Sequence, residues 1–369
     1  MPTGTSFDVT AEWLFDGRSM RRSQRVVAEN GSVVAIEPHG GAADFPVLAP
    51  GLVDIQVNGF GANDASHAAH GGLHRLDAEL AAEGTTTWLA TLVTDSLDRM
   101  SERIAAIEVC MTSAPGCAGI HLEGPFLGSR PGAHRVDRIV DPDMEWIASL
   151  STVVRLMTVG AESDAAFRAI RALVSRRITV ALGHTAPTES QFLEAVESGA
   201  NVVTHLFNAM NGVQHRDFGL ALGALTEPRI SFGLVADLVH VSPRAVGLAF
   251  SARPEGVILV SDSVAWDTES SRSRGVTVRD GAPRLPDGTL AGSSTPLAKC
   301  VANAINHCGV DPSSALAAAT SRPALALGLE HAGHLREGAF CDMVAFDSAY
   351  SVARVWRRLP SSRDFTTDD

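Results

Sequence analysis

The sequence predicts an α/β protein with a TIM-like (β/α)8 barrel and a small β-sandwich domain built from both chain termini. Eight apolar runs of strand length follow one another through the middle of the chain, and segments with helical spacing separate several of them. Alternating strands and helices form parallel β-α units, and eight such units suggest a barrel. The residues near both ends instead form short alternating patterns with turns, which predicts a separate β unit.

The predicted barrel strands are rich in β-branched and apolar residues. They cover residues 52–59, 85–94, 118–124, 153–160, 178–184, 201–207, 230–237 and 257–262. Helical spacing, with Ser or Thr near the start as plausible caps, predicts helices over 164–176, 188–199 and 243–253. We place the small β domain at residues 1–49 and 333–369, and the barrel at residues 50–332.

Composition excludes several classes of protein. The chain has 369 residues, 45% of them hydrophobic, and contains no uninterrupted apolar run of the roughly 18 residues that a membrane-spanning helix needs. Its formal charge of -12 argues against a nucleic-acid partner. The N-terminus lacks the pattern of a secretory signal, so we expect a cytoplasmic protein. Five cysteines without CxxC spacing argue against both a disulfide framework and a thiolate zinc site.

Three apolar runs end in side chains that can bind a metal. GIHLEGPF, ALGHT and VVTHLFNAM contain Glu123, His184 and His205, each followed by turn or helix-start residues. Because barrel strands deliver their functional residues at their C-terminal ends, we expect these three side chains at a common rim. Two imidazoles and one carboxylate suit a catalytic zinc ion with an open fourth position. The sequence therefore predicts one divalent metal ion, zinc, and metal-assisted hydrolysis.

Asp262 follows the eighth predicted strand and is the best candidate for the general base and acid. A carboxylate opposite a bound water can accept its proton and later deliver that proton to a leaving amine. Capping of the following loop is the alternative role for this residue.

Motifs along nearly the whole chain resemble those of the N-acetylglucosamine-6-phosphate deacetylases of the amidohydrolase superfamily. HLEGPF and THLFNAM form a specific pair, and they are accompanied by PGLVDIQVNGFG, LGHT, ADLVH, LVSDS and LAGSS. The resemblance implies hydrolysis of the acetamide of N-acetylglucosamine 6-phosphate to glucosamine 6-phosphate and acetate. It also implies the catalytic role of Asp262, a small amino sugar phosphate as the partner molecule, and a homodimer. Charge and hydropathy indicate neither a nucleic-acid nor a membrane partner.

The same resemblance implies further contacts with the substrate. It assigns His134 to the acetamide carbonyl or the sugar, as a catalytic and substrate-binding residue. It assigns the phosphate and the hydroxyl groups to Asn208, Ala209, Arg216 and His240. Taken alone, Arg216 could equally be a residue of a surface loop.

Many amidohydrolases carry a His-x-His pair for a second metal on the first strand, where this chain has Gln56 and Asn58. Neutral amides are poor zinc ligands, so we interpret this pair as a possible vestigial metal site and expect one metal. Three histidines nearby, His67, His70 and His74, have helical spacing on a polar stretch and fit a solvated face better than a metal site.

Departures from the usual family pattern leave other substrates open. Three segments depart from that pattern: TVGAE, HRDFG and SDSVAW, the last of which contains Trp266. These departures affect the predicted sugar and phosphate contacts more than the predicted metal ligands. The alternatives are an amidohydrolase acting on another N-acyl amino sugar, such as N-acetylgalactosamine 6-phosphate, or on a cyclic amide. A sugar-phosphate binding protein without catalysis is a more distant alternative.

Overall fold

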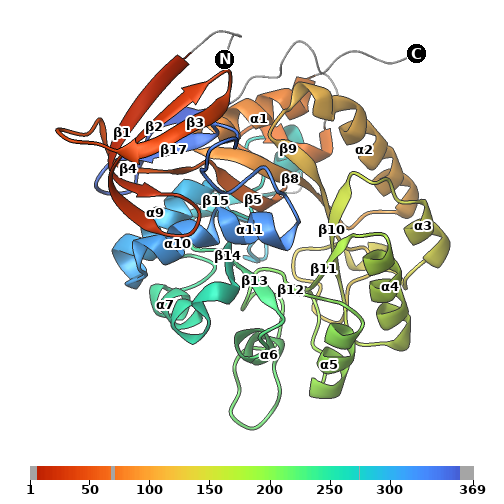
Figure 1. Ribbon diagram of the computed structural model, residues 1–369. Coiled ribbons are helices and arrows are strands. Elements are labelled where there is room, and N and C mark those ends of the chain that lie inside the picture. The colour runs from red at the N-terminus through yellow and green to blue at the C-terminus, as the bar shows by residue number, and fades with distance from the viewer. Residues whose placement is uncertain (1–5, 68–70, 274, 358–369) are drawn as a thin grey trace.

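The computed structural model describes residues 6–67, 71–273 and 275–357, and its main feature is a ring of eight parallel strands (Figure 1). Neighbouring strands follow in chain order, with β14 and β5 at the two ends of the sheet. The strands are β5 (Leu52–Val57), β8 (Thr85–Val93), β9 (Cys117–Glu123), β10 (Val154–Val159), β11 (Thr179–Leu182), β12 (Val202–Val203), β13 (Ser231–Leu234) and β14 (Val257–Leu259). The predicted barrel is confirmed.

Several strands are shorter than the sequence predicts at their C-terminal ends. β12 stops at Val203, because His205 and Phe207 have φ angles of 30° and 76°, which lie outside the extended region. β14 stops at Leu259, and Asp262 has a φ angle of 48°. The residues after these strands therefore turn out of the sheet, and the apolar pattern alone does not reveal that turn.

The junction between β5 and β14 closes the ring with side chains and isolated contacts. The Ser261 amide donates to both carboxylate oxygens of Asp54 at 3.3 Å. Just beyond β5, the backbone amide of Asn58 donates to the Ser263 carbonyl oxygen at 2.8 Å. The segment that carries Asp262 is thus fixed against the first barrel strand on both sides of that residue.

Helices surround the ring, as Figure 1 shows. The three predicted helices are present, and α4 begins at a Ser163 cap while Thr188 forms a capping box with Gln191 at the start of α5. The helices are α1 (Gly72–Ala82), α2 (Leu97–Cys110), α3 (Met144–Ser149), α4 (Asp164–Ser175), α5 (Glu189–Glu197), α6 (Leu220–Thr226), α7 (Pro243–Ala252), α8 (Glu269–Ser273), α9 (Leu297–Cys308), α10 (Pro312–Ala318) and α11 (Ser321–Ala326).

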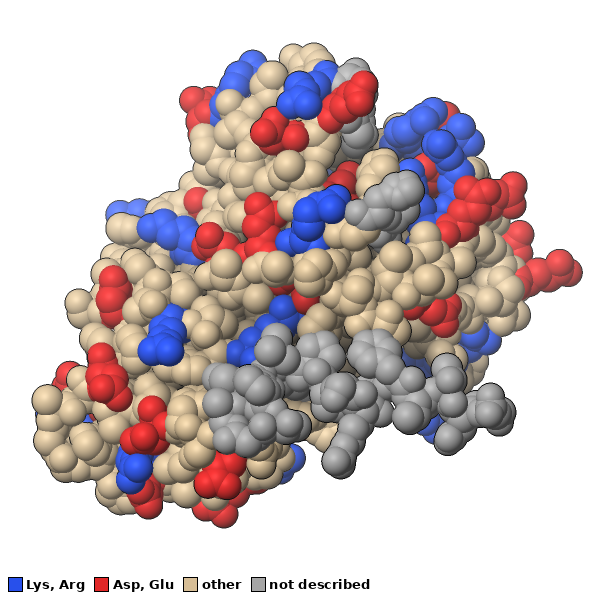
Figure 2. All heavy atoms as spheres, turned by 90° about the horizontal axis from the view of Figure 1, so that it is seen from above, with Lys and Arg blue, Asp and Glu red and all other residues tan. Residues whose placement is uncertain are grey.

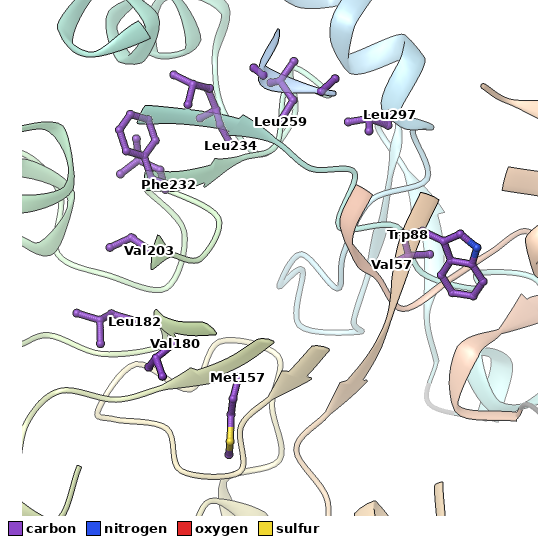
Figure 3. Packing of buried hydrophobic residues seen from close by; sticks show 14 of the residues in the cluster. Val57, Trp88, Met157, Val180, Leu182, Val203, Phe232, Leu234, Leu259 and Leu297 are labelled. Atoms are coloured by element: carbon purple, nitrogen blue, oxygen red, sulfur yellow. The ribbon is translucent and has the colours of Figure 1, made fainter. Parts of the chain in front are cut away.

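Two apolar layers hold the barrel together. The larger one packs strand residues such as Trp88, Met157 and Phe232 (Figure 3) with helix residues such as Leu173 and Leu297. The smaller one contains buried side chains from seven of the barrel strands or the residues next to them, and it also includes residues from α11 and just after it, Ala324 and Leu327. Burial of this apolar surface is the main favourable term in folding, and it makes the barrel a rigid support for the strand ends.

Both ends of the described chain contribute to a second sheet of six strands, in the order β18-β17-β4-β1-β2-β3. The strands are β1 (Ser6–Phe15), β2 (Met20–Glu29), β3 (Ser32–Pro38), β4 (Phe45–Pro50), β17 (Met343–Phe346) and β18 (Val352–Trp356). They pair antiparallel except for β1 with β4, which run parallel. The predicted small β unit from both termini is confirmed, and its strands form one mixed sheet. Residues 1–5 and 358–369 of the predicted domain lie outside the described residues.

Two short hairpins complete the strands: β6 (Gly59–Phe60) with β7 (Asn63–Asp64), and β15 (Thr277–Arg279) with β16 (Ala282–Arg284).

On the face in Figure 2, acidic and basic side chains of the described residues are interspersed. Within the described ranges, none of the helices has the length and apolar character that crossing a membrane requires. Cys117 and Cys300 are buried free thiols.

Candidate metal centre

The site lies at the C-terminal ends of the barrel strands. Glu123 is the last residue of β9, His184 and His205 each lie two residues beyond β11 and β12, and Asp262 lies three residues beyond β14. His184, His205 and Asp262 all have positive φ angles, of 52°, 30° and 48°. Non-glycine residues adopt this conformation at an energetic cost, and such residues concentrate at functional sites.

Glu123, His184 and His205 converge on one point. The Oε1 atom of Glu123 lies 3.3 Å from Nε2 of His184 and 3.2 Å from Nε2 of His205. The two Nε2 atoms lie 3.0 Å apart. All three residues are buried, with at most 5% of their surface exposed. The structure therefore brings together the three residues that the sequence predicts as metal ligands.

This donor set fits a divalent metal ion. Tetrahedral ligands at about 2.0–2.1 Å from zinc lie about 3.4 Å from one another, close to the three separations observed here. The second ring nitrogen of His184, Nδ1, is 3.2 Å from the Arg130 carbonyl oxygen, an arrangement that fixes a ligating imidazole. Nδ1 of His205 is buried and has no hydrogen-bond partner among the described residues.

His134 also lies beside this cluster. Its Nε2 atom is 3.8 Å from Oε2 of Glu123, and its ring centroid is 4.2 Å from that of His184. Glu123, His134 and His184 each offer a ligand atom within 4.8 Å of the other two, so they too could hold a metal ion. On the other side of its ring, Nδ1 of His134 is 2.9 Å from the Thr94 hydroxyl. The geometry places His134 at the edge of the metal centre, where it can reach a bound ligand.

Two side-chain amides, one in β5 and one just beyond it, donate to the carboxylates of the site. Nε2 of Gln56 donates to Glu123 Oε1 at 3.0 Å and to Asp262 Oδ1 at 3.1 Å. Nδ2 of Asn58 donates to the same Asp262 oxygen at 3.1 Å. The Gln56 amide thus lies between two carboxylates that would otherwise repel one another. Both Gln56 and Asn58 direct N–H groups, not oxygen lone pairs, to Asp262.

The electrostatics of the cluster follow from burial and from mutual contacts. The pKa of the Asp262 carboxyl is raised to about 7, mainly by burial and secondly by the negative charge of Glu123. Burial alone would also raise the pKa of Glu123, but hydrogen bonds from His184 and His205 bring it well below its usual range. Glu123 is therefore ionised at neutral pH, while Asp262 can take up and release a proton near pH 7.

The residues predicted to bind the sugar phosphate lie in the loops that follow β12 and β13. The charge of His240 lowers the pKa of the Asp262 carboxyl. Asn208 follows His205 in a turn and directs its side-chain amide to the carbonyl oxygens of His205 and Leu206. Ala209 packs close to the loop before His134, since a Cβ atom on Gly132 would lie 3.5 Å from it.

Arg216 lies in an exposed segment between β12 and α6, and no hydrogen bond or ion pair joins its side chain to the described residues. His67 pairs with Asp64, at 3.5 Å, and His74 contacts the Ser113 carbonyl oxygen, at 2.8 Å. Neither belongs to the metal cluster, and His70 lies outside the described residues.

The sequence did not predict the residues that hydrogen-bond to the site residues and hold them in place. Thr94 contacts the Glu123 carbonyl oxygen at 3.1 Å as well as His134. Asp237 contacts His240 Nδ1 at 2.7 Å. Asp237 lies inside the quoted motif ADLVH, so its spacing of three residues from the histidine was the available signal. Thr94 has no comparable signal in the sequence.

Comparison with known proteins agrees with this geometry. Residues 47–367 match the model of the amidohydrolase family, and the chain belongs to that family. It is 36% identical over 333 residues to a Bos taurus N-acetylglucosamine-6-phosphate deacetylase, covering 83% of this chain and 81% of the relative. It is also 31% identical to an N-acetylgalactosamine-6-phosphate deacetylase of Escherichia coli O157:H7, covering 94% and 95% of the two chains.

Solved structures give the same result. A mutant N-acetyl-D-glucosamine-6-phosphate deacetylase from Mycobacterium smegmatis, in complex with N-acetyl-D-glucosamine-6-phosphate, superposes with a TM-score of 0.88. It is 30% identical, and the match covers 96% of this chain and 98% of that one. The corresponding enzyme of Thermotoga maritima gives a TM-score of 0.87 at 27% identity, covering 95% and 98%. The chain is thus similar to deacetylases in both sequence and fold.

Proposed function

We propose that the protein hydrolyses the acetamide of N-acetylglucosamine 6-phosphate to glucosamine 6-phosphate and acetate. The observation that carries this proposal is the convergence of Glu123, His184 and His205 within 3.3 Å of one another, with Asp262 joined to the same cluster through Gln56. The amidohydrolase family membership and the similarity to deacetylases support a hydrolase of amide C–N bonds.

The chain's own residues supply the proton chemistry. A divalent ion held by Glu123, His184 and His205 would polarise the amide carbonyl group and acidify water. Asp262 accepts a proton from the water that attacks the acetamide carbon, and its raised pKa suits that role near neutral pH. His134 donates a hydrogen bond to the carbonyl oxygen as negative charge develops there. Asp262 then gives its proton to the departing amine nitrogen, so that one water is consumed for each acetate released.

Recognition of the sugar phosphate involves the loops around this centre. We assign His240 and the backbone around Asn208 and Ala209 to the phosphate and the hydroxyl groups. Arg216 supplies a cation for the phosphate from its exposed segment. Since that side chain has no partner in the described structure, it is available to reorient toward an anionic group.

Four further features belong to the same proposal. The ion is zinc, because imidazole and carboxylate ligands at tetrahedral spacing suit it. Gln56 and Asn58 mark a vestigial second metal site. The protein is a homodimer, as the family resemblance implies, and we place it in the cytoplasm. It divides into a barrel at residues 50–332 and a β domain at residues 1–49 and 333–369. Light scattering of the purified protein measures the oligomeric state directly.

The second candidate is deacetylation of N-acetylgalactosamine 6-phosphate, which the similarity to the Escherichia coli O157:H7 protein favours. Acetate release from both sugar phosphates, from unphosphorylated N-acetylglucosamine and from a cyclic amide, with added zinc, distinguishes these functions. We expect the largest kcat/KM with N-acetylglucosamine 6-phosphate. A larger value with the galactosamine isomer would favour the second candidate. Metal binding without acetate release from any compound would favour a sugar-phosphate binding protein.

A further inference from the structure

His240 and Asp237 form a buried pair beside the metal centre. Asp237 follows β13, and its Oδ2 atom lies 2.7 Å from Nδ1 of His240. Its other oxygen, Oδ1, accepts the backbone amides of Val239 and His240 at 2.9 and 2.8 Å. The side chains of His240 and Asp237 are 5% and 0% exposed. One carboxylate therefore fixes both the turn and the imidazole ring.

The protonation state of this contact follows from its charges. Burial would raise the pKa of the Asp237 carboxyl, but the hydrogen bond and charge of His240 bring it below its usual value. An ionised carboxylate only accepts hydrogen bonds, so Nδ1 of His240 must carry the proton in this contact. The other ring nitrogen, Nε2, then has no proton when the ring is neutral.

The charge of His240 lowers the pKa of the Asp262 carboxyl, so His240 lies within electrostatic reach of the metal centre. Nε2 has no hydrogen-bond partner in the part of the chain that the structure describes. It is therefore the ring atom that remains available for a ligand.

We propose that Asp237 is a positioning residue that fixes His240 in the Nδ1–H tautomer and so presents the unprotonated Nε2 as the acceptor for a hydroxyl group of the amino sugar phosphate. The identity of the ligand in this inference rests on the proposed function. The tautomer of His240 does not, because it is a property of the free protein. Asp237 itself touches no substrate in this account and acts through the orientation of His240.

The variant D237N separates this role from a purely structural one. The asparagine Oδ1 atom can still accept the two backbone amides of the turn, but its NH2 group replaces the oxygen that faces Nδ1. The ring must then accept at Nδ1 and carry its proton on Nε2, because an NH2 group cannot accept a hydrogen bond. We expect the turn to be retained and the tautomer to be reversed.

Nitrogen-15 NMR of the zinc-loaded protein, with the His240 signals assigned by comparison with H240Q, reads the tautomer directly. We expect a protonated Nδ1 in the wild type and a protonated Nε2 in D237N. An unprotonated Nδ1 in the wild type would overturn the proposal, and this measurement needs no catalytic activity. Acetate release that is absent in the wild type would therefore refute the proposed function without deciding the tautomer.

Kinetics provide the second test. We expect D237N to raise KM for the sugar phosphate by about tenfold, as loss of one oriented hydrogen bond predicts, with kcat and zinc content nearly unchanged. The double variant D237N/H240Q should be no worse than H240Q, because Asp237 acts only through His240. Additive losses, or an unchanged KM in D237N, would contradict the proposal. D311N is the matched control, because Asp311 caps the Ser314 amide at 3.0 Å without contacting a histidine.

Discussion

The Nε2 atoms of His184 and His205 lie 3.0 Å apart, although they come from different barrel strands. Both atoms also lie within 3.3 Å of the same Glu123 oxygen. A hydrogen bond between the two imidazoles explains their separation, but it does not explain why a carboxylate oxygen lies equally close to both nitrogens. A shared cation accounts for all three separations.

Removal of the metal should destabilise the protein and abolish acetate release. A ligand that binds only the folded state at a thousand times its Kd contributes about 4 kcal/mol to the free energy of unfolding. Chelation should therefore lower Tm, and added zinc should restore it. Thermal unfolding with and without chelator measures this effect. E123Q is the control, since its Tm should respond to neither treatment, and a wild type that also fails to respond would contradict the metal site.

D262N should lose turnover and keep its metal. General base catalysis typically contributes about 10²–10⁴ to the rate, so kcat should fall by that factor. Zinc content should stay equal to that of the wild type, because Asp262 is not among the proposed ligands. D267N is the matched control, since Asp267 lies five residues further along the same loop and pairs with exposed Arg272 at 2.7 Å. Near-wild-type kcat in D262N would remove the assigned role.

The amide of Gln56 should be required for both activity and stability. In Q56L, neither Glu123 nor Asp262 would receive this buried hydrogen bond, which predicts a loss of about 1–3 kcal/mol in unfolding free energy. The two carboxylates would also repel one another without the intervening donor, so kcat should fall about tenfold or more. Urea unfolding and acetate release test both effects.

Q24L provides the comparison for Q56L, because Gln24 is also a buried glutamine, 6% exposed, but lies in β2 of the second sheet. It should lower stability and leave kcat unchanged. Equal kcat values for Q56L and the wild type would show that the amide bridge does not support catalysis.

Asp54 should give stability an unusual pH dependence. Burial raises the pKa of its carboxyl to about 6, above the ordinary value of about 3.9 in the unfolded chain. Between these values the folded state binds more protons, so this group's contribution is present at low pH and is lost as pH rises. The difference in unfolding free energy between the wild type and D54N should fall by about 2 kcal/mol from pH 4 to pH 7.

Urea unfolding of the metal-free proteins at several pH values measures this difference without interference from metal binding. D311N should show no such decline relative to the wild type. A difference that stays flat or increases with pH would exclude a carboxyl with a raised pKa at the β5–β14 junction.

The sequence predicted the barrel well because apolar strands and amphipathic helices are local patterns. The three metal ligands were predictable for the same reason, since each lies just beyond a recognisable strand. Thr94 and the bridging contacts of Gln56 were not, because they depend on which strands face one another across the barrel. Arg216 was assigned from the family motif, and it lies exposed in the segment between β12 and α6, where the role of its side chain stays a prediction.

The most direct test of the central claim is an anomalous difference map of the zinc-loaded protein recorded at the zinc absorption edge. We expect one peak at about 2.0–2.2 Å from Glu123, His184 and His205, with His134 outside the coordination sphere. A map without a peak there, or a peak bound by His134 in place of His205, would contradict the proposed metal centre.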